Sequence, residues 1–125
     1  MNESEILCAF LFDKLTNDNK IKAIIGKKCY PLRTKEPIDG AYIIVDQFDT
    51  LMGETKDGSF ADSLTARILC VAKDYQSASS LTVAVKSLIN GLFVPSLGDT
   101  IQVVSRREDA EADEYLQELQ IRIDL

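Results

Sequence analysis

The chain has 125 residues, of which 46% are hydrophobic and 27% charged, and its formal net charge is −6. This composition and length exclude a disordered chain and predict a single domain over residues 1–125 with one hydrophobic core. The acidic balance, with basic residues scattered along the sequence, lacks the positive stripe that holds a phosphate backbone, so we expect no direct sequence-specific binding of nucleic acid.

The N-terminal segment predicts a first helix that runs from Asn2 or Ser4 to about Leu15. Either polar residue can cap the helix, and Glu3 and Glu5 lie near its positive end. The apolar face comprises Ile6, Leu7, Cys8, Phe10, Leu11, Phe12 and Leu15. It is wider than one contact with a small core needs, so we expect a partner subunit to cover part of it.

Neither a membrane span nor a signal peptide is predicted. The longest apolar run, Ile6–Phe12, is far shorter than the about 20 residues that cross a bilayer. Glu3 and Glu5 stand where a signal peptide carries basic residues. We therefore expect no membrane partner and a chain that stays in the cytoplasm of the cell that makes it.

The next segments predict a helical turn and then strands. Residues 21–25 favour a short helical turn that Gly26 ends, and residues 28–30 favour an extended segment before Pro31. Residues 32–40 are expected to form a loop. The β-branched and aromatic run at 41–45 indicates a strand buried on both faces, in the middle of a sheet. Residues 49–59 are polar and glycine-containing, as in a long hairpin tip.

The second half of the chain predicts strand, helix, strand and strand. Residues 60–72 alternate as a long strand whose second half is the better buried. Asp74 can cap a helix from Tyr75 to Asn90, with Gly91 at its end, and Pro95 and Gly98 mark a turn. Residues 101–106 predict a strand, residues 108–114 an acidic loop, and residues 119–125 a final strand with one solvent-exposed face.

These elements together predict an α+β fold. We expect a single mixed, mostly antiparallel sheet of four to five strands, with two main helices packed against it.

No recognisable catalytic motif is present in the sequence. It contains no histidine, which excludes Ser-His-Asp and Cys-His arrangements, and its six glycines match no phosphate-binding loop. Cys8, Cys29 and Cys70 are widely spaced and are expected to be buried, reduced thiols. We therefore predict no catalytic residues, no metal ligands and no cofactor, although carboxylates brought together by the fold leave an enzyme as a third alternative.

One acidic pattern has the alternate spacing that opens a calcium-binding loop. Asp109, Glu111 and Asp113 show this spacing, but the central glycine and the closing glutamate are missing. A solvated acidic turn is favoured, and a metal site is the alternative.

Several segments, in their order and spacing, resemble a known family. Cys29-Tyr30-Pro31-Leu32-Arg33 is similar to its "YPLR"-like motif, and residues 41–47 to the strand that follows it. Residues 66–72 and then Lys73-Asp74-Tyr75-Gln76-Ser77-Ala78 resemble its "A-R-V-Q-V-D-C-Y-A-x-T-Y-x-x-A" core. The family is the tail completion, or tail terminator, proteins of long-tailed bacteriophages and prophages. The resemblance covers about residues 29–91.

The resemblance implies a virion structural protein of the tail or neck that closes the head-proximal end of the tail tube or joins it to the head connector. It implies a homo-oligomeric ring, commonly sixfold, with the tail tube protein and head-tail connector proteins as partners. Neither catalysis nor a cofactor is implied, and before assembly the subunit would lie in the cytoplasm of the bacterial host. A small α+β ligand-binding or regulatory domain, with an apolar pocket, is the alternative.

A ring built from head-to-tail contacts needs two different surfaces on each subunit. We expect Phe10 and Phe12 on the first helix to form one, and Ile121 and Ile123, on an exposed edge of the last strand, to form the other. The loop at residues 49–59 is either a subunit or tube contact or a mobile hairpin tip. Its candidate contact residues are Asp49, Leu51, Met52, Glu54, Lys56 and Asp57.

Overall fold

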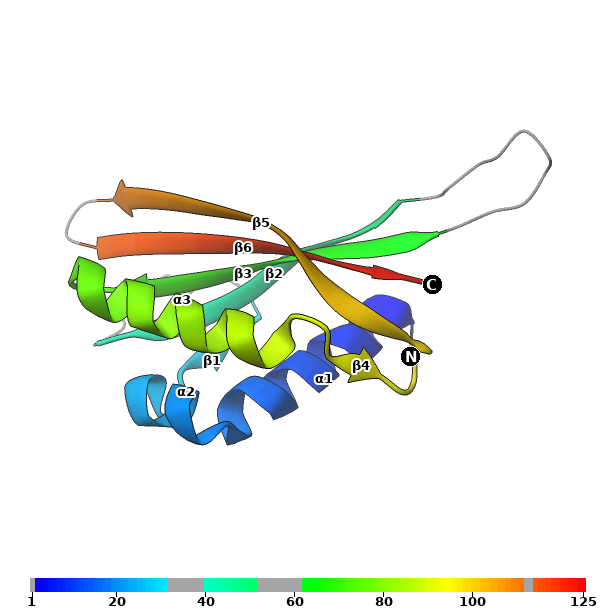
Figure 1. Cartoon of the computed structure of the whole chain (residues 1–125), viewed down its shortest axis with the longest axis horizontal. Helices are drawn as coiled ribbons and strands as arrows, with labels where there is room; N and C mark the ends of the chain where they lie inside the picture. Colours follow the sequence, from blue (N-terminus) through cyan, green and yellow to red (C-terminus); the bar gives the residue numbers. More distant parts are fainter. Residues whose placement is uncertain (1, 32–39, 52–61, 112–113) are drawn as a thin grey trace.

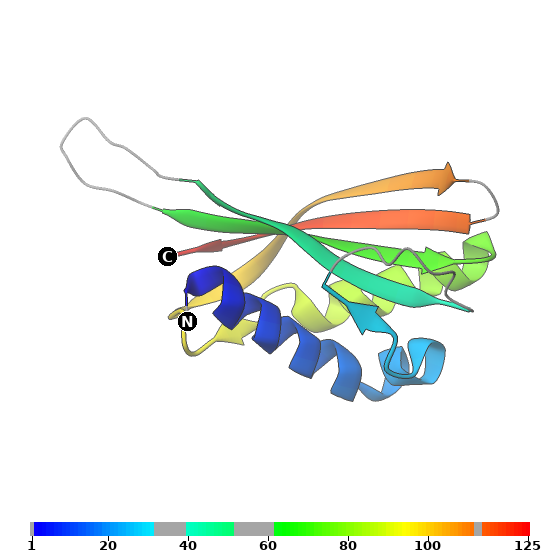
Figure 2. The ribbon, with the colours of Figure 1, turned by 180° about the vertical axis from the view of Figure 1, so that it is seen from behind.

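A computed structural model describes residues 2–31, 40–51, 62–111 and 114–125. Figures 1 and 2 show a strongly twisted sheet with the helices on one of its faces. The helices are α1 (Glu3–Asn17), α2 (Asn19–Ile25) and α3 (Tyr75–Ile89). The strands are β1 (Cys29–Tyr30), β2 (Tyr42–Leu51), β3 (Ser63–Ala72), β4 (Phe93–Val94), β5 (Asp99–Glu111) and β6 (Glu114–Asp124).

The sheet has six strands in the order β1-β2-β3-β6-β5-β4. The pair β1 and β2 is parallel, and the other neighbours are antiparallel. The prediction of a mixed, mostly antiparallel sheet is thus confirmed, but four to five strands was too few for the part of the chain described. The expected helical turn at 21–25 is the short helix α2, in addition to the two main helices.

Both main helices begin at the predicted caps. The side chain of Asn2 accepts a hydrogen bond from the backbone N–H of Glu5 (2.9 Å), and Asp74 accepts one from the backbone N–H of Ser77 (2.8 Å). These bonds satisfy backbone donors that the first helical turn leaves without partners. Gly91 follows α3 with a φ of 83°, a conformation that glycine adopts at little cost.

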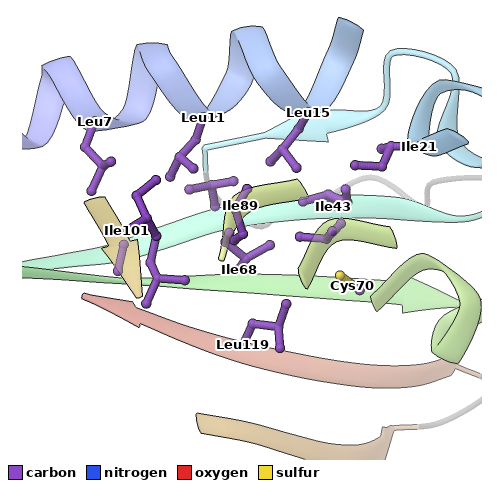
Figure 3. Close-up of a cluster of buried hydrophobic side chains, with 14 of the residues drawn as sticks. Leu7, Leu11, Leu15, Ile21, Ile43, Ile68, Cys70, Ile89, Ile101 and Leu119 are labelled. Carbon is purple, nitrogen blue, oxygen red and sulfur yellow. The ribbon is translucent and has the colours of Figure 1, made fainter. Parts of the chain in front are cut away.

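The core lies between the helices and the sheet (Figure 3). Leu7, Leu11 and Leu15 recur at helical spacing on α1, and all three are fully buried. From the sheet, alternate residues of β3 such as Ile68 and Cys70 point to the same core. The predicted burial of the second half of β3 is confirmed, because every residue from Ile68 to Ala72 is buried.

Strand β2 is longer than the predicted strand at 41–45. Asp49, Thr50 and Leu51, which were assigned to the hairpin tip, pair with Thr65, Leu64 and Ser63 of β3. A β-bulge between Asp46 and Asp49 interrupts the register, and Gln47 within it has a φ of 53°. Because of the extra residue in the bulge, Phe48 faces the core. The inward and outward positions of β2 therefore shift by one residue, which is why the predicted strand ended too early.

The predicted acidic loop at 108–114 was wrong over its described residues. Glu108, Asp109 and Ala110 continue β5 and pair with Gln117, Leu116 and Tyr115 of β6. A second bulge, between Val103 and Ser105, leaves Val104 unpaired and 51% exposed. This bulge explains why the apolar alternation of β5 ends at Val103. Residues 112 and 113 lie outside the described part.

Candidate interaction surfaces

The face of the sheet that carries no helix is polar across its middle. Nε of Arg67 donates to Oδ1 of Asp46 at 2.7 Å, and Nη2 donates to Oδ2 at 2.6 Å. Only 20% of the Arg67 side chain and 8% of the Asp46 side chain are exposed. The hydrogen bond to Asp46 raises the pKa of Arg67. On the neighbouring strands the same row continues with the exposed residues Gln120 and Ser105.

A depression of about 240 Å³ lies on this face, beside the ion pair. Its lining combines two guanidinium groups, three carboxylates and two leucines: Arg67, Leu69, Arg107, Glu108, Asp109, Leu116 and Glu118. Mixed charges of this kind suit polar contacts with another protein surface better than the apolar enclosure of a small ligand.

The same face is apolar where β2 begins and β3 ends. A second cluster there consists of Tyr42, Ile44, Leu69, Val71 and Leu116, with Tyr30 packed against it. All of these residues except the half-buried Tyr30 are at least 94% buried. The hydroxyl of Tyr42 donates to Glu114 at 3.0 Å. The sheet therefore carries apolar contacts on both faces, as the sequence of β2 predicted.

Among the described residues, β5 presents an exposed stretch of sheet edge, whereas the last strand does not. Strand β4 pairs only with Asp99 and Thr100, and the turn after α3 contacts β5 no further than Val103. From Val104 onward, no described residue pairs with the outer side of β5. The side chains at 104–110 are all exposed.

Strand β6 lies between β3 and β5, so the prediction that it offers an exposed edge was wrong. Its Ile121 and Ile123 are 0% and 1% exposed and belong to the core. The expected solvent-exposed face of β6 is confirmed by the exposed residues Gln120 and Arg122.

Two aromatic residues lie at the far end of the sheet, where α3 begins. The rings of Tyr75 and Tyr115 meet edge to face, with centroids 6.1 Å apart. They are 52% and 40% exposed, and the hydroxyl of Tyr75 donates to Glu108 on β5 at 3.0 Å. This hydrogen bond raises the pKa of Tyr75. Nothing in the local sequence pattern pointed to this cluster, since its members come from three separate elements.

A groove of about 810 Å³ lies between α2 and α3. Its apolar lining includes Ile24, Val83, Ala84 and Leu88, and Val83 is 53% exposed. Serines 79, 80 and 87 line it as well.

The predicted contact residues on α1 are partly used by the chain itself. Phe10 and Phe12 are half-buried and pack against the core, and the Nζ of Lys14 lies 5.5 Å from the ring centroid of Phe10. Part of each ring remains exposed on this face of α1.

The predicted contact loop is described only at its start. Asp49 is exposed on β2, and Leu51 is the last residue of that strand. Met52, Glu54, Lys56 and Asp57 lie outside the described residues, as do residues 32–39 of the other predicted loop.

None of the three cysteines forms a disulfide; Cys70 is buried, and Cys8 and Cys29 are half-buried. Within the described ranges, no cluster of His, Cys, Asp and Glu side chains is arranged to hold a metal ion. Among the same residues, no helix combines the length and apolar character needed to cross a membrane.

No family model matches the chain, and no curated protein matches it. A solved structure does resemble it: a chain of the virion of the native gene transfer agent (GTA) particle, with a TM-score of 0.74. The two chains are 17% identical, and the likeness covers 91% of this chain and 90% of that one. They therefore share a fold over nearly their whole lengths.

Proposed function

We propose that the chain is a structural subunit of a bacteriophage or prophage virion. The observation that carries this proposal is the shared fold with a chain of a virion particle, over nine tenths of both chains. The exposed surfaces agree with an assembly role, because a strand edge, a polar sheet face and an apolar groove all remain open to partners.

More specifically, we propose a tail completion subunit that closes the head-proximal end of the tail tube or joins it to the head connector. The motif order from Cys29 to Ala78 supports this place in the particle, since it resembles that of tail completion proteins. The subunit acts as a homo-oligomeric ring between the tube protein and the connector. The proposed role is structural and needs no catalysis, which agrees with a sequence that offers no histidine base and no phosphate-binding loop.

Deletion of the gene in the phage or prophage that carries it tests this proposal. We expect heads and tails to accumulate separately, with infectious or transducing particles reduced to background, and plasmid-borne wild-type gene to restore them. Electron microscopy of the lysate identifies the defect. Normal particle yield and normal joined particles after deletion would overturn the proposal.

Immunogold labelling of a tagged, complementing subunit tests the location. Gold particles at the junction of head and tail support the tail completion role. Labelling spread along the tail tube or over the head would overturn that role while leaving a virion subunit. Absence of the tagged protein from purified particles would overturn the virion assignment itself.

A further inference from the structure

In the described part of the chain, two stretches of strand edge have no strand partner, one on the β5 side of the sheet and one on the β2 side. One is the outer side of β5 from Val104 to Glu111, and the other is the outer side of β2 from Asp46 to Leu51. We propose that subunits join head to tail by pairing β5 of one copy with β2 of the next, so that one sheet continues around the ring. This inference rests on the ring of the proposed function and names its contact.

The edge of β5 has the length and exposure that strand pairing needs. Its residues pair with β6 on one side as far as Glu111. On the other side, the backbone of Leu92 reaches Ile101, and the side chain of Asn90 reaches Val103. Beyond that point the backbone groups have no strand neighbour among the described residues. A long unpaired edge is a ready template for another chain.

The edge of β2 is open for a similar reason. Strand β1 has two residues and pairs only with Ile43 and Ile44. From Asp46 onward, no strand in the described part of the chain lies outside β2. Gln47, Asp49 and Thr50 are exposed there.

The strand directions favour this junction. Three successive antiparallel pairings, from β2 to β3, β6 and β5, leave β2 and β5 running in opposite directions. When the next copy keeps its orientation relative to the ring axis, its β2 therefore runs antiparallel to β5. A two-fold dimer through either edge alone would leave the other edge open, whereas head-to-tail pairing uses both.

The offset between the two edges fits closure. The middle of the free β5 stretch, near Arg107, lies level with Leu69 of β3, and the middle of the free β2 stretch, near Asp49, lies level with Thr65. If these two stretches pair, the next subunit is shifted along the strand direction by about four residues. This shift is spread over the four long strands β2, β3, β6 and β5. One residue of shear per strand gives a strand tilt of roughly 36° in closed barrels.

Charge at the junction agrees with this register. Asp49 and Arg107 both lie on the helix-free face, and both side chains are exposed. The same shift brings Asp49 of one copy level with Arg107 of the next. Opposite charges that face each other across two strands stabilise the pair, and like charges would oppose it.

Cysteine crosslinking tests the contact and its register. In a Cys8→Ser, Cys29→Ser, Cys70→Ala background, Asp49→Cys is combined in turn with Ser105→Cys, Arg107→Cys and Asp109→Cys. Directly opposed residues on paired strands come close enough for a disulfide. We expect a ladder of linked multimers, strongest with Arg107→Cys, both in purified particles and in concentrated purified protein. The control pairs Asp49→Cys with Lys20→Cys, an exposed site on α2 that belongs to neither edge.

Ladders no stronger than this control, in both preparations, would overturn the proposed contact. If the subunit is still present in the particles, the proposed function stands and only the strand pairing falls. Absence from particles, with ladders in the purified protein, would overturn the proposed function while supporting the contact.

Charge reversal keeps the natural cysteines and provides a second test. Arg107→Asp and Asp49→Arg should each lower assembly, because each places like charges across the junction, and the double variant should recover it in part. Circular dichroism checks that every variant folds. Single variants that assemble like the wild type, or a double variant that is no better than the worse single one, would count against the proposed register.

Discussion

Asp46 and Arg67 form a doubly hydrogen-bonded ion pair across β2 and β3, one step before the bulge at Gln47 and Phe48. The Asp46 carboxylate is almost enclosed, so both of its oxygens depend on this single guanidinium among the described groups. Arginine suits this task because its planar fork matches a carboxylate with two parallel bonds. The pair also holds the register of the two strands at the point where the bulge begins.

Removing one partner of this pair should cost more than removing both. Arg67→Met leaves the Asp46 carboxylate buried without its cation, and such a change costs about 3–5 kcal/mol in a fully buried pair. Since water reaches part of Arg67, we expect about 2–3 kcal/mol here. The double variant Asp46→Leu, Arg67→Met should lie within about 1 kcal/mol of the wild type. Urea unfolding measures all three proteins, and a double variant as unstable as the single one would contradict this account.

The core contact of α1 should dominate the stability of the fold. Leu11 is fully buried between α1 and the sheet, so Leu11→Ala should lower the free energy of unfolding by about 2–5 kcal/mol. Val83→Ala on α3 is the matched control, because Val83 is 53% exposed; its change should stay within about 0.5 kcal/mol. Equal losses in the two variants, by thermal or urea unfolding, would show that α1 is not fixed to the core as described.

The helices could be predicted from the sequence because their signals are local. Asn2 and Asp74 lie directly before their helices, and Gly91 follows Asn90, the C-cap of α3. The lengths of β2 and β5 could not be predicted, because each strand contains a bulge whose extra residue interrupts the two-residue alternation. Gln47 and Val104 break the alternation of apolar and polar residues in the sequence, but each strand continues after its bulge.

Glycine at position 47 should stabilise the protein. Gln47 has a φ of 53°, a region that costs most side chains roughly 1 kcal/mol or more, while glycine enters it freely. Gln47→Gly is therefore expected to raise the midpoint of urea unfolding slightly, and Gln47→Val to lower it, because a β-branched residue fits this conformation worst. Gln120→Val, on the exposed face of β6, serves as the control for the added β-branched side chain. The reverse order for the two Gln47 variants would argue against the bulge.

The exposed edge could not be predicted, because the order of strands in the sheet is not written in any local pattern. The last strand alternates apolar Ile121 and Ile123 with polar residues, as an edge strand or an inner strand can. Only the pairing of β6 with both β3 and β5 decides between the two, and it depends on long-range contacts. The charged stretch 106–109 looked like a loop for a related reason. Charged side chains are common on edge strands, and here they hide the strand character of the segment.

Alkaline pH should destabilise the protein through its buried thiols. Burial raises the pKa of Cys70 from 9.0 to about 12, and burial together with the other two thiols does the same for Cys29. Below pH 9 these thiols are protonated in both the folded and the unfolded chain, so they add no pH dependence. Between pH 9 and 12 they ionise only when the chain unfolds, which lowers stability by about 1.4 kcal/mol per pH unit for each thiol.

Comparison with Cys70→Ala isolates the contribution of one thiol from the lysines and tyrosines that ionise in the same range. The variant should be less stable at pH 8, because it loses packing at a fully buried site. Its free energy of unfolding should then fall less steeply above pH 9, by about 1.4 kcal/mol per unit, since the Cys70 thiol no longer contributes. Urea unfolding of the wild type and of Cys70→Ala at about pH 8, 9.5 and 10.5 measures the slope of the free energy of unfolding against pH for each protein. Parallel slopes would mean that Cys70 is reached by water, in conflict with its burial.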